Sequence, residues 1–346
     1  MSLFKSRTLL RDVMLLATPM SVMIDPANGC NFRCVFCPTA NPDLLASVGR
    51  PIGVMKYPLF TKIIDDMTAF ERPVQSLLLY KDGEPLVNRR LADMVRYAKK
   101  KGVADEISIT TNAALLSRER AVELIEAELD NLRVSVEHVH DEGYRKITQT
   151  FDDYQAIIAN VTALFEEKNR RGSPLKVHAK IVNVALTPEE LLTFKSDFEP
   201  ISDSVTVETL MGWSNTEDMD CLLGTEPTTG VDGHTGLKTD RKVCPSPFKT
   251  LAVNFDGRVS LCCVDWSMGT VVGDAAKEHL VDIWNGEALR QFRLTHLKGQ
   301  RDSIPACNGC QYIQGMSAES DLDDIADDLI AQLSLSGVLS SKRSAE

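Results

Sequence analysis

The chain has 346 residues, a formal net charge of −11 and 43% hydrophobic residues. A chain of this length buries a large core, which predicts one large domain with a smaller one beside it. The acidic balance argues against a nucleic acid as the main partner, because phosphate binding requires a basic face. No apolar stretch approaches the roughly 20 residues of a membrane span. Nine cysteines in so long a chain do not indicate the disulfide framework of a small secreted domain, so we expect a cytoplasmic enzyme.

The first segment, residues 1–18, precedes the first predicted strand. Basic residues at Lys5, Arg7 and Arg11, followed by the apolar region Met14–Ile24, give it the outline of a signal peptide. The segment continues into the next motif without a convincing cleavage site. We therefore interpret residues 1–18 as a leader strand or helix.

Three cysteines follow the first predicted strand in one short segment. Cys30, Cys34 and Cys37 are separated by three and then two residues, and the aromatic Phe36 stands just before the last. Such spacing lets one tight loop offer three thiolates to a single [4Fe–4S] cluster. With no local fourth thiol, one iron would remain open to a ligand that is not protein.

This pattern resembles the signature of the radical S-adenosylmethionine (radical SAM) superfamily. In that superfamily S-adenosylmethionine chelates the open iron, and its reductive cleavage yields a 5′-deoxyadenosyl radical. The resemblance implies a [4Fe–4S] cluster and S-adenosylmethionine as cofactors, Phe36 among the cofactor-binding residues, and a flavodoxin- or ferredoxin-type electron donor. The alternative is a zinc site, which requires four N or S ligands; His138 and His140 could supply one but lie far along the chain.

Strand-like apolar runs alternate with amphipathic helical stretches from about Ser21 to Val207. The runs are short, rich in Val, Ile and Leu, and lack clean alternation, which is typical of parallel strands covered by helices. Six such units imply an α/β fold, a partial (β/α)6 TIM-like barrel with its active-site loops at the strand C-terminal ends. The predicted strands are Val22–Asp25, Ser76–Tyr80, Glu106–Thr111, Leu132–Glu137, Leu175–Val182 and Ser204–Glu208. The predicted helices are Tyr57–Phe70, Asn88–Lys101, Ser117–Leu129, Asp152–Arg171 and Thr187–Phe198.

A second motif, Gly83-Glu84-Pro85, follows the second predicted strand. It resembles the glycine–glutamate motif of the superfamily, whose backbone and carboxylate hold the amino group of the cofactor. Glycine permits a close backbone approach, and the Glu84 carboxylate can accept from an ammonium donor.

Polar residues at the next strand ends extend the resemblance. Asn112 ends the third strand, and Ser135 and Glu137 share one face of the fourth by the two-residue period. In relatives the polar residues at these places reach the ribose hydroxyls and the methionine carboxylate, and Lys180 is a candidate partner for that carboxylate. Ala113 stands where relatives often have glycine.

The C-terminal third carries a second cysteine set after a polar stretch, Met211–Thr239, which reads as an active-site loop or linker. Asp256-Gly257 is a strong hairpin signal and would return Cys262 towards Cys244. Four thiolates complete the ligand set of a cluster. The cysteines of this region are Cys244, Cys262, Cys263, Cys307 and Cys310.

This arrangement resembles the SPASM and twitch extensions of the superfamily, which carry auxiliary iron–sulfur clusters. The resemblance implies one auxiliary [4Fe–4S] cluster in a small hairpin-plus-helix domain, held by Cys244, Cys262, Cys307 and Cys310. Whether Cys262 or Cys263 is the ligand stays open, and a structural zinc site with four cysteine ligands is the alternative. The expected organisation is a leader (1–18), the barrel (19–210), a loop or linker (211–243), the auxiliary domain (244–314), and an acidic amphipathic helix with a tail disordered from Ser336 (315–346).

The preferred function is oxidation of a small polar metabolite, such as a sugar or aminocyclitol, with an auxiliary cluster taking the second electron. The alternative is an epimerase or an enzyme that modifies ribosomal peptides, with Cys221, an exposed loop thiol, as hydrogen-atom donor. A zinc-ribbon scaffold or an electron carrier without catalysis is the non-enzymatic reading.

Overall fold

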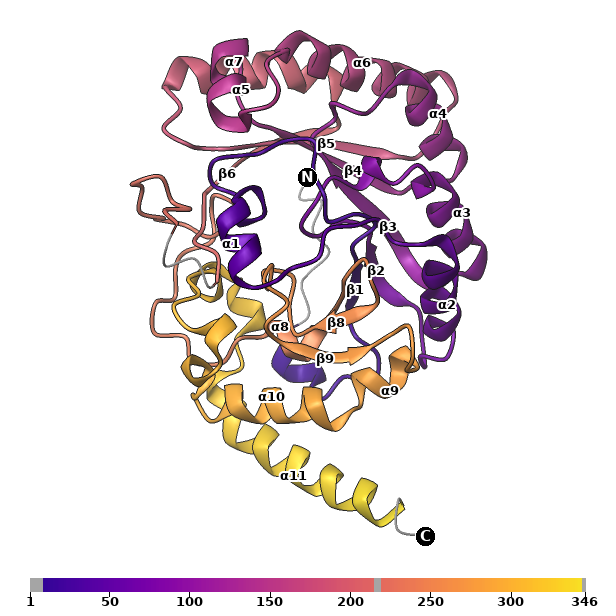
Figure 1. Ribbon diagram of the computed structural model, residues 1–346, viewed down its shortest axis with the longest axis vertical. Coiled ribbons are helices and arrows are strands. Elements are labelled where there is room, and N and C mark those ends of the chain that lie inside the picture. The colour runs from indigo at the N-terminus through magenta and orange to yellow at the C-terminus, as the bar shows by residue number, and fades with distance from the viewer. Residues whose placement is uncertain (1–8, 215–218, 344–346) are drawn as a thin grey trace.

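The computed structural model describes residues 9–214 and 219–343. Within them, nine strands form one sheet in the order β6-β5-β4-β3-β2-β1-β7-β8-β9. The first six are parallel to their neighbours and curve around a central space (Figure 1). Their bounds are β1 Ser21–Ile24, β2 Val74–Leu78, β3 Ala104–Thr111, β4 Asn131–Val136, β5 Lys176–Val182 and β6 Ser204–Glu208.

Helices cover the outer face of this sheet (Figure 1). The predicted partial (β/α)6 barrel is thereby confirmed, with two short helices, α1 and α5, that the sequence did not predict. The helices of this half are α1 Pro42–Ser47, α2 Tyr57–Met67, α3 Leu91–Lys101, α4 Arg118–Glu126, α5 Asp141–Thr148, α6 Tyr154–Arg170 and α7 Pro188–Phe198.

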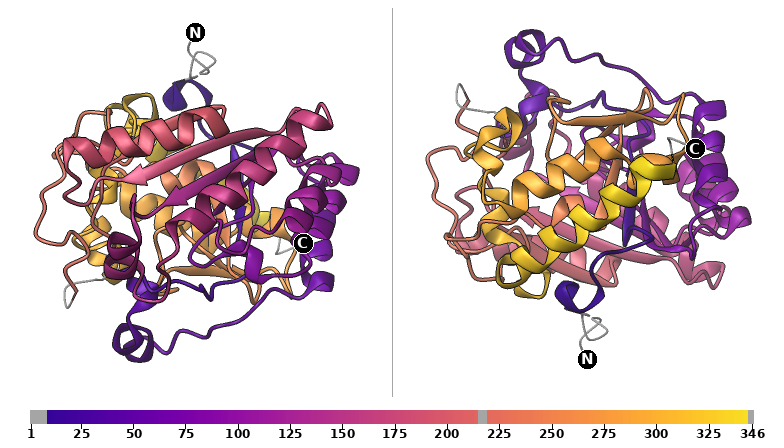
Figure 2. Two further views of the ribbon diagram at one scale, coloured as in Figure 1. Left: turned by 90° about the horizontal axis from the view of Figure 1, so that it is seen from above. Right: turned by 90° about the horizontal axis from the view of Figure 1, so that it is seen from below.

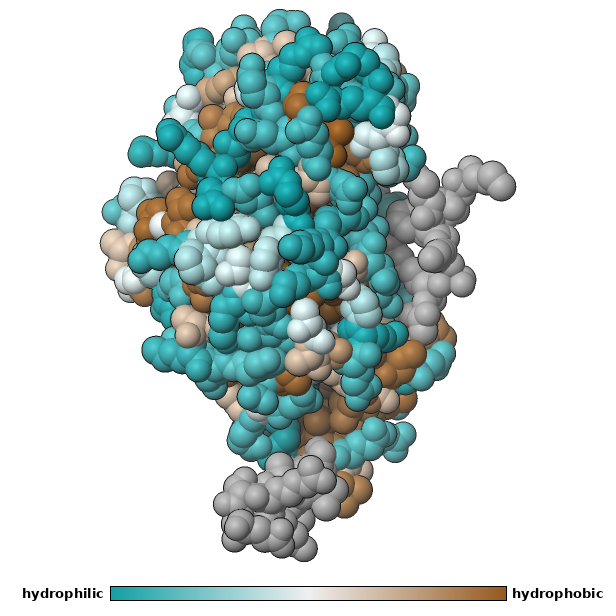
Figure 3. All heavy atoms as spheres, turned by 90° about the vertical axis from the view of Figure 1, so that its right-hand side faces the viewer, coloured by the Kyte–Doolittle hydropathy of each residue, from teal (hydrophilic) through white to brown (hydrophobic). Residues whose placement is uncertain are grey.

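Local sequence explains where these helices begin and which way they face. The Thr187 side chain accepts from the backbone of Glu190 and closes a capping box at the start of α7, and Ser117 caps α4, as side chains of this type do at N-caps. The outer face of α2, α3 and α4 is mostly hydrophilic (Figure 3), so their apolar residues turn towards the sheet.

Buried and partly exposed residues alternate along the strands more regularly than the sequence suggested, most clearly in β4. Leu132, Val134 and Val136 are buried in the core, whereas Arg133 and Ser135 take the opposite face and keep partial exposure. The period of two in a strand separates these sets. The polar set lines the inside of the barrel.

The C-terminal part continues the barrel sheet. β7 Thr250–Val253 and β8 Arg258–Ser260 form the predicted antiparallel hairpin, and β9 Val271–Asp274 pairs with β8. β7 also pairs in parallel with β1, from Ser21 opposite Thr250 to Ile24 opposite Val253. The segment that leads to the second cysteine set is therefore fixed to the strand that leads to the first.

The C-terminal helix lies across the underside of this extension (Figure 2), where a second apolar core is buried. This core joins Leu10 near the N-terminus to Phe248, Leu294, Leu329 and Leu333, so the predicted amphipathic C-terminal helix packs on the body. The helices here are α8 Ser246–Lys249, α9 Leu280–Trp284, α10 Glu287–Leu297 and α11 Ala326–Arg343.

Three predicted segments end differently or fall partly outside the described residues. The leader contains a 3-10 helix at Leu10–Val13, while residues 1–8 lie outside the described part, as do 215–218 of the loop. The tail was expected to be disordered from Ser336, but α11 continues to Arg343; the segment has no proline to stop a helix that Leu329 and Leu333 already anchor. Residues 344–346 are outside the description. Among the described residues, no helix is long and apolar enough to cross a membrane.

Candidate functional site

The first cysteine loop lies at the C-terminal end of β1 and is held from outside by α5. The backbone of Arg33 donates to Thr148 O at 2.9 Å, and that of Val35 donates to Ile147 O at 2.9 Å. The Phe32 ring packs among aromatic neighbours, with its centroid 5.1 Å from that of Phe151. These contacts fix the loop between its first and last cysteine.

The three thiols of this loop lie in a setting that disfavours their ionisation. Burial raises the pKa of Cys30 to about 12 and also raises the pKa values of Cys34 and Cys37. The carboxylate of Glu137 acts in the same direction at all three, and neighbouring thiols do so at Cys30 and Cys34. Thiolates form here only against a strong local positive charge, which a metal centre supplies. The donor set therefore fits an iron–sulfur cluster.

Gly83 and Glu84 pack directly against the backbone that leads into this loop. A Cβ on Gly83 would lie 2.2 Å from Ala27 O and 2.6 Å from the Asn28 carbonyl carbon, so only glycine fits. The Glu84 backbone N–H donates to Gly29 O at 3.1 Å. The predicted close approach of this motif is present.

The Glu84 carboxylate, however, has protein partners instead of an open face. It is 2% exposed and accepts from Leu86 N at 2.9 Å, Thr111 Oγ1 at 2.7 Å and Asn112 N at 2.8 Å. Burial raises its pKa to about 7, against these hydrogen bonds. It thus links the end of β2 to the end of β3, while the expectation that this carboxylate receives the cofactor's amino group stays a prediction. The sequence could not show that two strand ends would point three donors at it.

Asn112 contacts the cysteine loop from the end of β3. Its Nδ2 donates to Asn31 Oδ1 at 2.9 Å and lies 3.7 Å from Cys30 Sγ. Ala113, at the position where glycine is frequent in relatives, has φ of 60°, a conformation that glycine adopts at lower cost. Pro85 begins the 3-10 turn Pro85–Val87.

The remaining predicted cofactor residues lie on the inner faces of β4 and β5. Ser135 and Lys180 are directly opposed in the register of these strands. The Lys180 ammonium donates to Glu208 Oε2 at 2.5 Å, so its partner here is a protein carboxylate. Burial raises the pKa of Glu137 to about 7, although Lys180 opposes the shift. Phe36 is half-buried within the cysteine loop.

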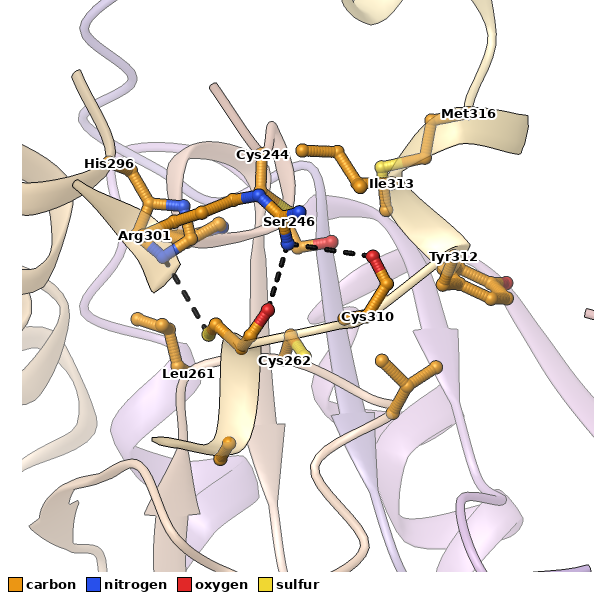
Figure 4. A pocket seen from close by; sticks show the side chains of 14 residues that line it. Cys244, Ser246, Leu261, Cys262, His296, Arg301, Cys310, Tyr312, Ile313 and Met316 are labelled. Atoms are coloured by element: carbon orange, nitrogen blue, oxygen red, sulfur yellow. Dashed lines mark hydrogen bonds between the residues drawn. The ribbon is translucent and has the colours of Figure 1, made fainter. Parts of the chain in front are cut away.

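The second set of cysteines gathers at one pocket, which Figure 4 shows from close by. Cys244 precedes α8, Cys262 follows β8, and Cys307 and Cys310 follow α10, yet all four line this pocket. Cys263 does not line it, so the geometry favours Cys262 as the ligand, the choice that the sequence left open.

The Cys307–Cys310 turn is held by one side chain, that of Arg301. The Arg301 Nη1 donates to Cys307 O at 2.8 Å and reaches Cys310 O at 3.5 Å (Figure 4). Burial raises the pKa of Cys307 to about 12 and of Cys310 to about 11. Four thiols that line one pocket supply the number of ligands that a metal centre requires.

Three other candidate residues, Cys221, His138 and His140, lie elsewhere. Cys221 is 3% exposed and is not among the residues that line the second pocket, so the view of it as an exposed loop thiol is wrong. His138 and His140 turn their Nε2 atoms towards Glu190, at 3.6 and 3.2 Å. Their Nδ1 atoms accept backbone N–H groups from Val139 and Gly143, which places the imidazole proton on Nε2. This tautomer makes Nε2 a donor to the carboxylate, although the ligand atoms of these three residues lie within 4.8 Å of one another, a spacing that could hold a metal ion.

Sequence reasoning passed over charged residues inside the barrel. Arg133 Nη2 donates to Glu208 Oε1 at 2.6 Å. Burial opposes the charge of Arg133, but Tyr80 and Glu208 beside it raise its pKa. Tyr312, which lines the second pocket, belongs to the same electrostatic group. The signal for Arg133 and Glu208 was a charge within an apolar strand, since such residues are rarely buried without a role.

Comparison with known families agrees with this geometry. The family model of the radical SAM superfamily matches residues 24–184, and that of the SPASM iron–sulfur cluster-binding domain matches residues 244–311. The chain belongs to the radical SAM superfamily. It carries a C-terminal SPASM domain, and its cofactors are accordingly a [4Fe–4S] cluster, S-adenosylmethionine and auxiliary iron–sulfur.

Curated relatives match over part of their length. The GTP 3',8-cyclase of Limosilactobacillus fermentum is 31% identical over 150 residues, which are 42% of this chain and 43% of the relative. The tungsten-containing aldehyde ferredoxin oxidoreductase cofactor-modifying protein of Pyrococcus furiosus is 37% identical over 109 residues, 31% of this chain and 28% of the relative. The matches thus span less than two thirds of these relatives.

Solved structures share the fold over most of the chain. BtrN in complex with AdoMet and 2-DOIA superposes with a TM-score of 0.53 at 16% identity, covering 87% of this chain and 97% of BtrN. SuiB of Streptococcus suis bound to S-adenosylmethionine gives a TM-score of 0.62 at 15% identity, covering 82% of this chain and 70% of SuiB. At such identities the likeness concerns the fold.

Proposed function

We propose that this radical SAM enzyme is an oxidoreductase that removes hydrogen from a small polar metabolite, a sugar or aminocyclitol, with an auxiliary cluster receiving the second electron. The observation that carries the proposal is the gathering of Cys244, Cys262, Cys307 and Cys310 at one pocket. Four thiols saturate a [4Fe–4S] cluster, and a saturated cluster suits electron transfer rather than substrate ligation.

The residues assigned to the cofactors follow from the two cysteine sets. Cys30, Cys34 and Cys37 would hold the cluster with the open iron, beside Asn112 and the backbone of Gly83 and Glu84. When bound, the cofactors supply a hydrogen-abstracting radical and an acceptor for one further electron. The protein's own part is to bind and orient the substrate and to exclude water.

The inner face of the barrel supports a polar substrate. Arg133, Lys180 and Glu208 form a contiguous charged group there, with Tyr80 from the end of β2 and Tyr312 from the C-terminal region in its field. A few convergent polar groups in an enclosed space are what orient a small ligand. Guanidinium and ammonium donors suit hydroxyl, amino-sugar or carboxylate oxygens.

The structural relatives leave two substrate classes to compare. The BtrN structure holds 2-DOIA, a small molecule, and a structure of SuiB holds the precursor peptide SuiA. The charged barrel interior favours the first class for this chain. We further propose a cytoplasmic enzyme with a flavodoxin- or ferredoxin-type donor, since both clusters require reducing conditions.

Epimerization remains the second candidate, with Cys221 as hydrogen-atom donor. Its support is the position of Cys221 in the loop after β6. Its burial means that this role requires the surrounding loop to open.

The test is product analysis with the reconstituted holoenzyme. Candidate sugars, aminocyclitols and peptides, each deuterated at carbon, are incubated anaerobically with S-adenosylmethionine and dithionite in ordinary and in deuterated water. Transfer of deuterium into 5′-deoxyadenosine, with a product that has lost the abstracted deuterium and one proton, supports the oxidoreductase. Solvent deuterium at a product carbon without net oxidation supports the epimerase, and turnover of peptides alone overturns the small-metabolite class.

A further inference from the structure

A group of fully buried charges lies between the two cysteine sites. It consists of Asp25 at the end of β1, Arg50 after α1, and Lys81 and Asp82 after β2, and we call it the charged joint. Asp82 Oδ2 accepts from Arg50 Nη2 at 2.8 Å and from Lys81 Nζ at 2.5 Å, and these three side chains have no exposure. Asp25 is likewise 0% exposed.

The joint links the two cysteine segments through consecutive contacts. On the first side, Cys37 Sγ lies 3.1 Å from Thr39 Oγ1, which donates to Asp82 O at 3.2 Å. On the second side, Lys81 Nζ donates to Asp265 O at 3.1 Å. Asp265 closes the segment that begins with Cys262.

Stability does not explain this arrangement. Buried ion pairs recover little more than their desolvation cost, and apolar residues of similar volume are often as stable. Several atoms of the joint also have no hydrogen-bond partner among the described residues: both carboxylate oxygens of Asp25, Nε and Nη1 of Arg50, and Oδ1 of Asp82. Buried polar atoms of this kind call for a functional reason.

We infer that Lys81 is a positioning residue for the auxiliary cluster. It holds the Cys262–Asp265 segment against the S-adenosylmethionine-binding motif, and its positive charge favours the reduced state of the cluster. The inference rests on the proposed function, which assigns Cys262 to that cluster.

Lys81 keeps its positive charge although it is buried, and this charge lies close to the Cys262–Asp265 segment of the SPASM domain. Burial alone would lower the pKa of Lys81, but the carboxylates of Asp82 and Asp25 outweigh it and raise that pKa. The Lys81 ammonium donates to Asp265 O at 3.1 Å, three residues after Cys262, so the charge lies close to the second cysteine set. A fixed cation in a low-dielectric site stabilises added negative charge nearby, and local charge and hydrogen bonds set cluster potentials.

The experiment measures the reduction potential of the auxiliary cluster in the full-length reconstituted protein by electron paramagnetic resonance. Its signal is identified as the one that persists when Cys30, Cys34 and Cys37 are all alanine. Lys81→Met should lower the ratio of reduced to oxidised auxiliary cluster at least about tenfold at fixed potential, which is about 59 mV for a one-electron couple. Lys81→Arg should restore the ratio, because it keeps charge and donors.

The matched control is Lys168→Met. Lys168 is also a buried lysine that donates to one carboxylate, Asp203 at 2.8 Å, and to one backbone carbonyl, Leu175 O at 3.0 Å, but it belongs to α6. Its loss should leave the potential unchanged. Where Lys81→Met fails to fold, Lys81→Gln removes the charge with a polar side chain, and the same fall is expected.

Three results would count against the inference. An unchanged potential in Lys81→Met or Lys81→Gln overturns it. An equal fall in Lys168→Met reduces it to a general effect of lost buried charge, and so also overturns it. Iron missing from the Cys30, Cys34 and Cys37 alanine variant refutes the auxiliary cluster itself, a failure of the proposed function that the iron assay separates from the other two.

Discussion

The two cysteine sites of this molecule are assembled in different ways. Cys30, Cys34 and Cys37 occupy one loop after one strand, so their convergence is a local property. Cys244, Cys262 and the Cys307–Cys310 turn come from three separate segments, so theirs depends on the β7–β8 hairpin and on the packing of α10. The two sites also differ in completeness, since three thiols leave one iron of a cluster open and four leave none. This difference is the basis for our proposal that the first site activates the substrate and the second transfers electrons.

The largest expected effect tests the first site alone. Changing Cys30, Cys34 and Cys37 together to alanine should abolish 5′-deoxyadenosine formation and leave about four of about eight irons per chain. Iron and sulfide assays after anaerobic reconstitution, with chromatography of the nucleoside products, measure both. Cleavage of S-adenosylmethionine at a wild-type rate in this variant would show that the comparison assigns the chemistry to the wrong site.

The second prediction compares two adjacent cysteines, of which only the first lines the second pocket. Cys262→Ala should lower the iron content to about four per chain and stop substrate oxidation, while cleavage of S-adenosylmethionine continues. Cys263→Ala is the matched control and should keep about eight irons, because Cys263 does not line the pocket. The reverse pattern would exchange the two roles, and one zinc with four irons in the wild-type protein would mean that the second site is structural.

More of the first cysteine site than of the second could be predicted from the sequence. The loop spacing, the barrel and the strand-end motif could all be predicted because each is encoded within a few residues or in a repeated pattern. The choice between Cys262 and Cys263 could not, since adjacent residues differ only in which way the chain turns after β8. The parallel pairing of β7 with β1 and the contact of the charged joint with Asp265 were also missed, because they join segments far apart in the sequence.

A third prediction concerns the Glu84 carboxylate, which links the ends of β2 and β3 beside the first cysteine site. In Glu84→Gln one amide N–H group must face a backbone or hydroxyl donor, which should lower the free energy of unfolding by about 1–3 kcal/mol. Denaturant titration of the reconstituted protein measures this, with Glu123→Gln as the control, because half of the Glu123 side chain is exposed. A weaker affinity for S-adenosylmethionine with unchanged unfolding would instead support the cofactor-binding role that the sequence predicts for this carboxylate.

The smallest expected effect is a pH dependence of the free energy of unfolding. It is caused by Asp25 in the charged joint between the two cysteine sites. Burial, with Asp82 beside it, raises the pKa of Asp25 to about 7, above its unfolded value of about 3.9. The folded state therefore binds more protons than the unfolded state between these values. The stabilisation that this proton provides is complete below pH about 4 and is lost as the pH rises through about 7.

Asp25→Asn, which cannot ionise, should flatten the fall in unfolding free energy between about pH 4 and about pH 7, a slope of at most about 1.4 kcal/mol per pH unit. Denaturant titrations across this range measure the slope. Asp105→Asn, at an exposed position on β3, should leave it as in the wild type. An unaltered slope in Asp25→Asn would mean that Arg50 and Lys81 keep Asp25 ionised across this pH range. The charged joint would then hold two cations and two carboxylates.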